Sequence, residues 1–373
     1  MEKLNKILKK QITATVIAIL LGFVVAMIIL AFTGYNPFEA FGVLFKGIFS
    51  KPKYIANVII KATPIIITGV SVSFAFKVGL FNIGAEGQYL IATVVATIVG
   101  IVTPNLPGVI EYPLIILSGV VAGAVWGAIA GFLKAKYEIH EVIVGIMLNW
   151  IAFYFCNFIV STNYFHQPNS TATKEISSKG FDLIYSWKKS DAGRDFLKQN
   201  DVLKELIYKT DMNFGIIFAV IVAIVVAIVL KKTCKGYELR AVGFNKHAAE
   251  FAGINVRKNI LHAMLIAGAL SGLAGALMVT GVSHKISTLG TFENYGFNGL
   301  SVALIAGNSP IGCIFAGLLF AGLIYGGGSI QSEIGAPSEI INIMIGTIVF
   351  FIALSRLIPM FADKLTKRGE GRA

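Results

Sequence analysis

The sequence predicts an all-α, polytopic transmembrane helical bundle, and three observations lead to this fold class. Of the 373 residues, 55% are hydrophobic and only 14% are charged. The mean hydropathy of +0.75 is too high for a soluble chain of this length. The charged residues gather in short stretches between long apolar runs, and those runs are the expected membrane spans.

The first span is expected at residues 12–32. This uncharged run follows the basic start MEKLNKILKK. It is longer than the apolar core of a signal peptide, and Tyr35-Asn36-Pro37 follows it in place of a small-residue cleavage pattern. We therefore expect a retained anchor with the N-terminus in the cytoplasm.

Nine further uncharged stretches continue the bundle. They lie at 62–76, 87–103, 112–133, 142–160, 212–230, 259–281, 296–307, 310–327 and 338–358. Two of them, 62–76 and 296–307, are too short to cross about 30 Å of hydrocarbon as straight helices, so we expect broken or half-helical segments there. About ten spans result, and a count of eight stays open.

The order of the short stretches suggests an internal symmetry. They take second place among the first five spans and third place among the second five, which indicates two five-span repeats. Because five is odd, the second repeat would be inverted relative to the first, and a transport path would lie between them. Residues 1–373 would then form a single transmembrane domain.

Lysine and arginine near the span ends set the orientation. Four basic clusters fall on one side of the membrane when the number of spans is even, namely 1–10, Lys134 with Lys136, 231–258 and 364–372. Both termini and the loop 231–258 are then cytoplasmic. By parity, 161–211 is an extracellular loop insertion, and its own lysines and arginines do not oppose this because long loops translocate largely regardless of charge.

Small residues at four-residue spacing indicate close helix packing. Three ridges of this kind occur: Gly119, Gly123, Gly127 and Gly131; Gly268, Gly272 and Gly275 or Ala276; Gly312, Ala316 and Gly317. Packing within the chain is favoured over a subunit contact or a lining of the path.

No catalytic or metal-binding constellation stands out in the sequence. A G-x-x-x-x-G-K-[ST] phosphate loop is absent, so the chain is not itself a P-loop ATPase. The five histidines lack ligand spacing, and Cys156, Cys234 and Cys313 are scattered. An ion-coupled carrier usually keeps carboxylates within its spans, and Glu86, at a span end, is the candidate here.

Three segments carry a resemblance to a known family. Residues 79–88 read GLFNIGAEGQ, residues 134–150 read KAKYEIHEVIVGIMLNW, and residues 236–258 read GYELRAVGFNKHAAEFAGINVRK. With the span-rich remainder, they resemble the inner-membrane permease subunits of ABC importers of the ribose and branched-chain amino acid class, most closely the nucleoside-type permeases. His140 stands where that family's segment has Asn.

The resemblance implies several partners and no cofactor in this chain. A separate tandem-domain ATPase would hold ATP and Mg, and a second permease subunit would complete a pseudo-twofold dimer, homomeric or heteromeric. An extracellular substrate-binding lipoprotein would deliver a small polar solute, with a nucleoside first among the candidates. Membrane lipid surrounds such a protein in the plasma membrane, and nucleic acid is not a partner.

The loop 231–258 is expected to couple this chain to the ATPase. Residues 248–252 predict a short helix of small residues that ends at Gly253. The residues that match the family's coupling pattern are Gly243, Asn245, Ala248, Ala249, Gly253 and Ile254. An ordinary basic cytoplasmic loop is the alternative, because orientation alone predicts basic loops.

The segment FNIGAEGQ suggests a break in the chain before the third span, with Glu86 in a first helical turn. The candidates for a gate or a solute path are Asn82, Glu86, Gln88 and Asn149. A capping and packing role is the slightly favoured alternative.

These observations lead to a permease that imports a solute by alternating access. The spans offer no charged pocket, and an uncharged solute fits that absence. A sugar or branched-chain amino acid ABC permease is the alternative of the same class. An ion-coupled secondary carrier and a membrane scaffold without transport are the alternatives of other classes.

Overall fold

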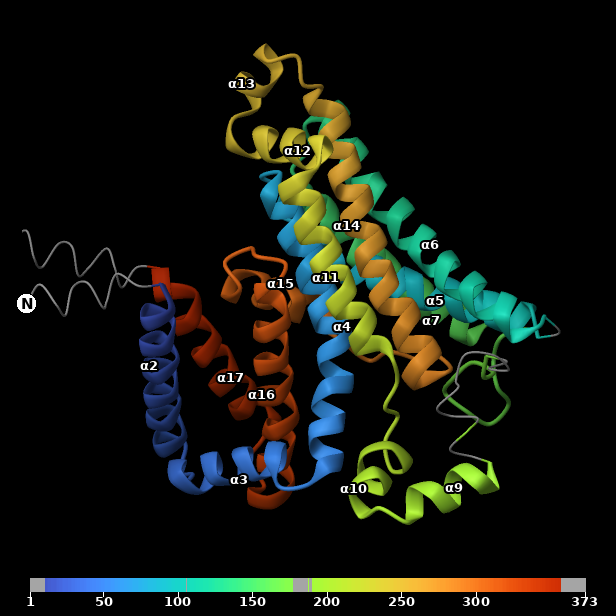
Figure 1. Ribbon diagram of the computed structural model, residues 1–373, viewed down its shortest axis with the longest axis vertical. Helices are drawn as coiled ribbons and strands as arrows, with labels where there is room; N and C mark the ends of the chain where they lie inside the picture. The colour runs from blue at the N-terminus through green and yellow to red at the C-terminus, as the bar shows by residue number, and fades with distance from the viewer. Residues whose placement is uncertain (1–10, 105, 177–186, 188–189, 357–373) are drawn as a thin grey trace, which may run out of the picture. The chain divides into compact units, whose positions relative to one another are not determined.

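The computed structural model describes residues 11–104, 106–176, 187 and 190–356 (Figure 1). In these ranges most of the chain is helical, and extended pairing is limited to isolated bridges. The basic termini used above for orientation, 1–10 and 364–372, lie outside the described residues. The chain divides into two compact units, one from residues 51–321 and the other from the described parts of 1–50 and 322–373.

The smaller unit holds α2 (Gln11–Phe32), α3 (Pro37–Phe49), the end of α16 (Gly312–Ile334), α17 (Ser338–Ala353) and the short η3 (Leu354–Arg356). Helix α3 was not among the predicted spans. It begins after Asn36, whose side chain accepts a hydrogen bond of 3.1 Å from Phe38 N, with Pro37 in the first turn. The ring of Phe41 packs edge-on against Phe23 of α2.

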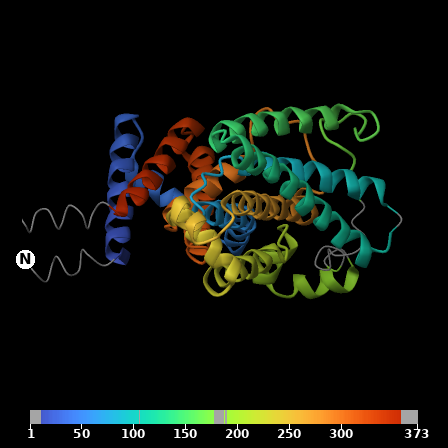
Figure 2. The same ribbon diagram turned by 90° about the horizontal axis from the view of Figure 1, so that it is seen from above.

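The larger unit is a bundle of long helices that run side by side (Figures 1 and 2). They are α4 (Pro52–Lys77), α5 (Ala85–Val102), α6 (Gly108–Tyr137), α7 (Glu141–Ser161), α11 (Gly215–Lys232) and α14 (Val256–Met278), which continues as the π-helical η2 (Val279–Ser283). The short α15 (Tyr295–Ile305) packs against α4.

Two groups of short helices lie at opposite ends of this bundle (Figure 1). At one end are α12 (Cys234–Phe244) and α13 (Lys246–Phe251). At the other end are α9 (Asp191–Lys198), α10 (Asp201–Leu203) and η1 (Lys204–Tyr208). That 231–258 is cytoplasmic and 161–211 extracellular stays a prediction.

Seven of the described helices are long and apolar enough to cross a membrane, and three apolar helices are shorter: Val16–Phe32 within α2, α15 and α17. The predicted half-helix at 296–307 corresponds to α15. The predicted break at 62–76 is wrong, because α4 is a continuous helix of 26 residues. Lys61 lies inside that helix and is partly exposed, so it does not mark the end of a span. The count of ten spans and the inverted repeats stay predictions.

The first two glycine ridges pack against each other, which confirms packing within the chain. They join α6 to α14, the most extensive helix contact in the larger unit. A Cβ atom on Gly123 would lie 2.7 Å from the Cα of Gly272, and one on Gly127 would lie 3.0 Å from the Cα of Gly268. The two backbones can approach this closely only because neither helix carries side chains at the contact.

Helix α4 is the most buried of the helices long enough to span a membrane, and two of its hydroxyl groups bond to α14 and α15. Ser71 donates a hydrogen bond of 2.6 Å to the carbonyl of Ala267 and accepts one of 2.8 Å from Ser271. Thr68 donates one of 2.9 Å to the carbonyl of Tyr295. These bonds fix α14 and the start of α15 along α4, in the middle of the larger unit.

Candidate functional site

A non-helical segment, residues 284–294, leads into the bundle between η2 and α15. Asn157 of α7 pairs with the backbone of Leu289, accepting from its N–H at 2.8 Å and donating to its carbonyl at 3.1 Å. Farther along, the ring of Phe292 contacts those of Trp150 and Phe153 at 4.9 and 5.1 Å between centroids. The segment therefore follows α7 from near its C-terminal end toward its middle, and α15 begins inside the bundle.

Glu86 joins this segment to α5. As predicted, it lies in the first turn of α5. Its carboxylate accepts hydrogen bonds from the backbone N–H groups of Asn294 at 2.8 Å and Gly296 at 2.6 Å. The first N–H groups of a helix have no partner within the helix, so Glu86 caps α15 from a different part of the chain. Its side chain is fully buried.

The other three predicted gate residues lie at the same place. The side-chain amides of Asn82 and Gln88 pair reciprocally at 3.0 and 3.1 Å. Asn149 of α7 accepts from Gly87 N at 2.8 Å and donates to the carbonyl of Ile83 at 3.1 Å. All four predicted residues are buried and paired, which is how a polar network specifies one arrangement in an apolar interior.

The sequence did not single out Glu293. It lies two residues before α15, next to the uncharged run 294–332, and it is classed as exposed. Its position in the sequence could have indicated it. A carboxylate at the edge of a short apolar stretch lies at membrane depth when that stretch begins inside the bundle.

The predicted extracellular loop 161–211 covers the outer part of the non-helical segment. Backbone hydrogen bonds of 2.8 Å run from Thr173 N to the carbonyl of Ile286, from Ile176 N to that of His284, and from Thr288 N to that of Thr171. The loop therefore holds the segment at the end of the bundle that lies away from α12 and α13.

The short helix predicted at 248–252 is present as α13, over Lys246–Phe251, and its role in coupling stays a prediction. Asn245 caps its N-terminus, accepting from His247 N and Ala248 N at 3.0 and 3.1 Å. Gly253 ends it in the left-handed conformation, with φ of +80°. Ile254 N then donates to the carbonyl of Ala249 at 2.9 Å, which closes the turn.

The helix before it, α12, is attached to the bundle by close contacts. A side chain on Gly243 would meet the carbonyl of Lys77 at the end of α4, so Gly243 is needed for packing within this chain. Hydrogen bonds from Lys235 at 2.9 Å and Asn259 at 3.2 Å lower the pKa of the Glu238 carboxyl and tie α12 to α14.

Exposed side chains of α12 and α13, the pair of helices predicted as the coupling element, include two that the sequence did not single out. Phe251 is 95% exposed and Phe244 is 89% exposed. Ala248 is exposed, whereas Ala249 is buried. Large aromatic side chains with so little cover are typical of contact sites for another protein. Phe244 ends α12 and Phe251 ends α13, at one end of the bundle.

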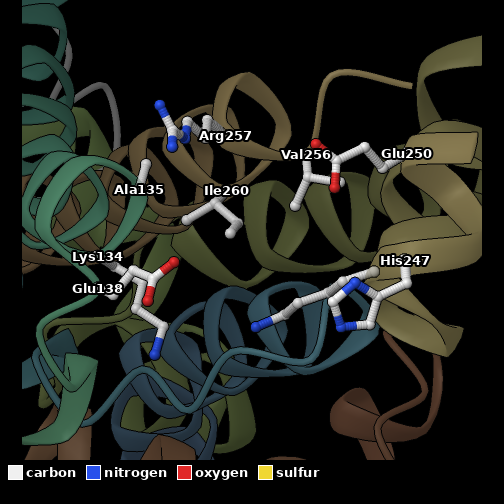
Figure 3. Close-up of a pocket in the computed structure, with 9 residues that line it drawn as sticks. Lys134, Ala135, Glu138, His247, Glu250, Val256, Arg257 and Ile260 are labelled. Atoms are coloured by element: carbon white, nitrogen blue, oxygen red, sulfur yellow. The ribbon is translucent and has the colours of Figure 1, made fainter. Parts of the chain in front are cut away.

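A cavity of about 480 Å³ lies between the end of α6 and the helices α13 and α14 (Figure 3). His247 and Glu250 stand on one side, and Lys134 and Glu138 stand on the other. Lys134 also forms an ion pair of 2.9 Å with Glu141. The lining carries charges of both signs. The cavity lies beside α13, at the same end of the bundle as Phe244 and Phe251.

Comparison with known proteins places the chain in a family. Residues 54–354 match the family described as the branched-chain amino acid transport system / permease component. The guanosine ABC transporter permease protein NupP of Bacillus subtilis is 38% identical over 354 residues, which cover 95% of this chain and 96% of the relative.

Two further relatives are similar over most of their length. The nucleoside ABC transporter permease protein NupB of Lactococcus lactis is 34% identical over 95% of this chain and 94% of its own. The glucose ABC transporter permease protein TsgB13 of Haloferax volcanii is 29% identical over 93% of this chain and 88% of its own. No solved structure gives a significant match. The chain therefore belongs to the branched-chain amino acid transport system / permease component family and is a multi-pass membrane permease of the ABC transporter class.

Proposed function

We propose that this permease imports a nucleoside by alternating access, with ATP hydrolysed in a separate subunit. The observation that carries the transport role is the non-helical segment 284–294, which enters the bundle along α7. The support for a nucleoside is the identity of 38% and 34% to permeases named for guanosine and nucleosides, over nearly the whole chain. The glucose permease is less similar, at 29%.

The exposure of the non-helical segment supports a path for solute. Its exposed residues are Ser287, Thr288, Gly290, Thr291, Glu293 and Asn294. In a bilayer, non-helical backbone is tolerated only where protein buries it or where it lines water. A segment that is open here would line an aqueous path, completed by a second permease subunit. The buried network around Glu86 and Asn149 would position the segment and serve as the hinge of a gate.

The coupling element would contact the ATPase. Phe244 and Phe251 project from the end of the bundle, and Ala248 leaves room beside them for a groove in a partner. ATP and Mg would bind to that partner. The residues predicted for coupling, from Gly243 to Ile254, would keep this element rigid so that movement of the ATPase reaches the bundle.

The proposal also includes the membrane topology of the chain and its partners outside the cytoplasm. Residues 1–373 would form a single permease domain in the plasma membrane with both termini cytoplasmic and with inverted five-span repeats. The loop 161–211 would face outward, toward a substrate-binding lipoprotein. A second permease subunit would complete the transporter.

Uptake in cells tests the proposal. The permease is produced with its ATPase, second permease and receptor, and uptake of labelled guanosine, adenosine, ribose and leucine is compared. Nucleoside uptake should exceed that of ribose and leucine. Uptake of ribose or leucine without any nucleoside uptake would reject the nucleoside as the solute. The assignment to the importers would still hold.

A further inference from the structure

Glu293 lies at membrane depth, as its two neighbouring attachments show. On one side, Leu289 is bonded to Asn157 of α7. On the other, Gly296 is bonded to Glu86 beside Asn149. Asn157 and Asn149 are eight residues apart on α7, or about 12 Å at 1.5 Å per residue, and both lie within an apolar helix long enough to cross a membrane.

Glu293 lacks a counter-charge in the described part of the chain. The side chain is exposed, and among the described residues no lysine, arginine or histidine lies within ion-pair distance of it. An unpaired carboxylate facing hydrocarbon would cost roughly 2.5–3.5 kcal/mol, so charged groups inside spans face the interior of a bundle or a water-filled cavity. Glu293 therefore belongs to an aqueous part of the protein.

The neighbours of Glu293 are aromatic. The carboxylate faces the hydroxyl of Tyr89, whose side chain is buried. The ring of Tyr89 contacts that of Tyr295 at 5.3 Å, and Phe292 contacts Phe297 at 5.7 Å. An acceptor of hydrogen bonds thus lies between ring surfaces, at the point where the segment meets α15.

We propose that the Glu293 carboxylate is a solute contact in the transport path. It would accept hydrogen bonds from two adjacent O–H or N–H donors of an uncharged polar solute, since one carboxylate can receive a bidentate pair. Phe292 and its neighbouring rings would offer the apolar surface for a ring of the solute. The inference rests on the proposed function and adds a residue to it.

The Glu293 carboxylate would also exclude anionic solutes from the path. A solute that carries its own carboxylate or phosphate would be repelled at Glu293, because no cation among the described residues offsets the two negative charges. Nucleosides and sugars would be accepted, whereas nucleotides and amino acids would be disfavoured. The path would thus carry one charged side chain, in contrast to the uncharged path expected from the sequence.

Chemical labelling tests the position of Glu293 without knowledge of the solute. In a Cys234→Ser background, Glu293→Cys should react with a water-soluble maleimide in vesicles of the assembled transporter, whereas Val125→Cys on the exposed apolar face of α6 should not. Guanosine, adenosine or ribose, whichever is transported, should slow the reaction. Absence of labelling from both sides of the membrane would overturn the proposal.

Transport measurements test the contact itself. In proteoliposomes with receptor and ATPase, Glu293→Gln should lower the uptake rate about tenfold or more, while assembly and ATP hydrolysis remain. Glu293→Asp, which keeps the carboxylate, should recover part of the rate, and Asp191→Asn on α9 should have no effect. Normal uptake by Glu293→Gln would contradict the proposal.

The two tests separate this inference from the proposed function. If the transporter carries ribose and no nucleoside, the assignment of a nucleoside as the solute is rejected. Labelling of Glu293→Cys and the effect of Glu293→Gln on ribose uptake still test the role of Glu293. A proton relay would give a different result: uptake by the wild-type transporter would depend on a proton gradient, and Glu293→Gln would remove that dependence.

Discussion

The carboxylate of Glu86 accepts a hydrogen bond of 2.6 Å from the backbone N–H of Gly296, which joins the first turns of two helices 210 residues apart in sequence. The contact leaves no room for a side chain on Gly296, because a Cβ atom there would lie 2.5 Å from the Cα of Glu86. The start of α15 is thereby fixed inside the bundle, where the non-helical segment ends.

Glu86→Ala should destabilise the permease. It would leave the N–H groups of Asn294 and Gly296 without acceptors, at a cost of about 1–3 kcal/mol each for a buried donor. Glu86→Gln keeps one acceptor oxygen and should lose less. Thermal unfolding in detergent measures the effect, with Asp195→Ala on the exposed face of α9 as the control. Equal stability of Glu86→Ala and the control would contradict the capping role.

Gly123→Ala should weaken the contact between α6 and α14. The added methyl group would lie 2.5 Å from the carbonyl oxygen of Gly268 and 2.7 Å from the Cα of Gly272, so the helices would have to separate. Overpacking of this kind costs about 1–3 kcal/mol. Gly346→Ala, where nothing lies within 4 Å, is the matched control. If both variants unfold at the same temperature, the close packing does not contribute as described.

Phe251→Ala should reduce binding of the ATPase without reducing stability. An aromatic anchor at the centre of an interface contributes about 2 kcal/mol or more, so co-purification of the ATPase should fall steeply. Ala248→Trp should have the same effect through bulk. Phe196→Ala, at the opposite end of the bundle, is the control. Gly243→Trp is unsuitable, because it would also clash with Lys77.

The orientation predicted from basic residues is tested by single cysteines in a Cys234→Ser background. Ser190→Cys should be labelled from outside in intact cells, and Lys246→Cys should be labelled only after the membrane is opened. Both positions are exposed, so a lack of labelling cannot come from burial in the chain. The reverse pattern would invert the orientation and remove the coupling role of α13.

The positions of the helices could be predicted because hydropathy reflects the surrounding solvent. The glycine ridges were also informative, since small residues at four-residue spacing leave few options for packing. The misplaced break at 62–76 came from a single charge. Lys61 lies within α4, and its long side chain lets one charge occur inside a span.

The sequence was enough to predict which residues form the buried site around Glu86, but not which residues they contact. Asn82, Glu86 and Gln88 are close in sequence, and their position before a span indicated a junction. Their partners come from distant helices, so no local pattern could show that Glu86 caps α15 or that Asn149 holds Gly87. Glu293 was missed for the same reason, because its depth follows from the fold.

Uptake by reconstituted protein tests the central claim most directly. Proteoliposomes that contain this permease with its second permease, ATPase and receptor should take up labelled guanosine only when ATP is supplied and the ATPase is active. Proteoliposomes with this chain alone should show no uptake under a proton or sodium gradient. Gradient-driven uptake by this chain alone would contradict the account, because the chain would then be a carrier and its energy would not come from a partner.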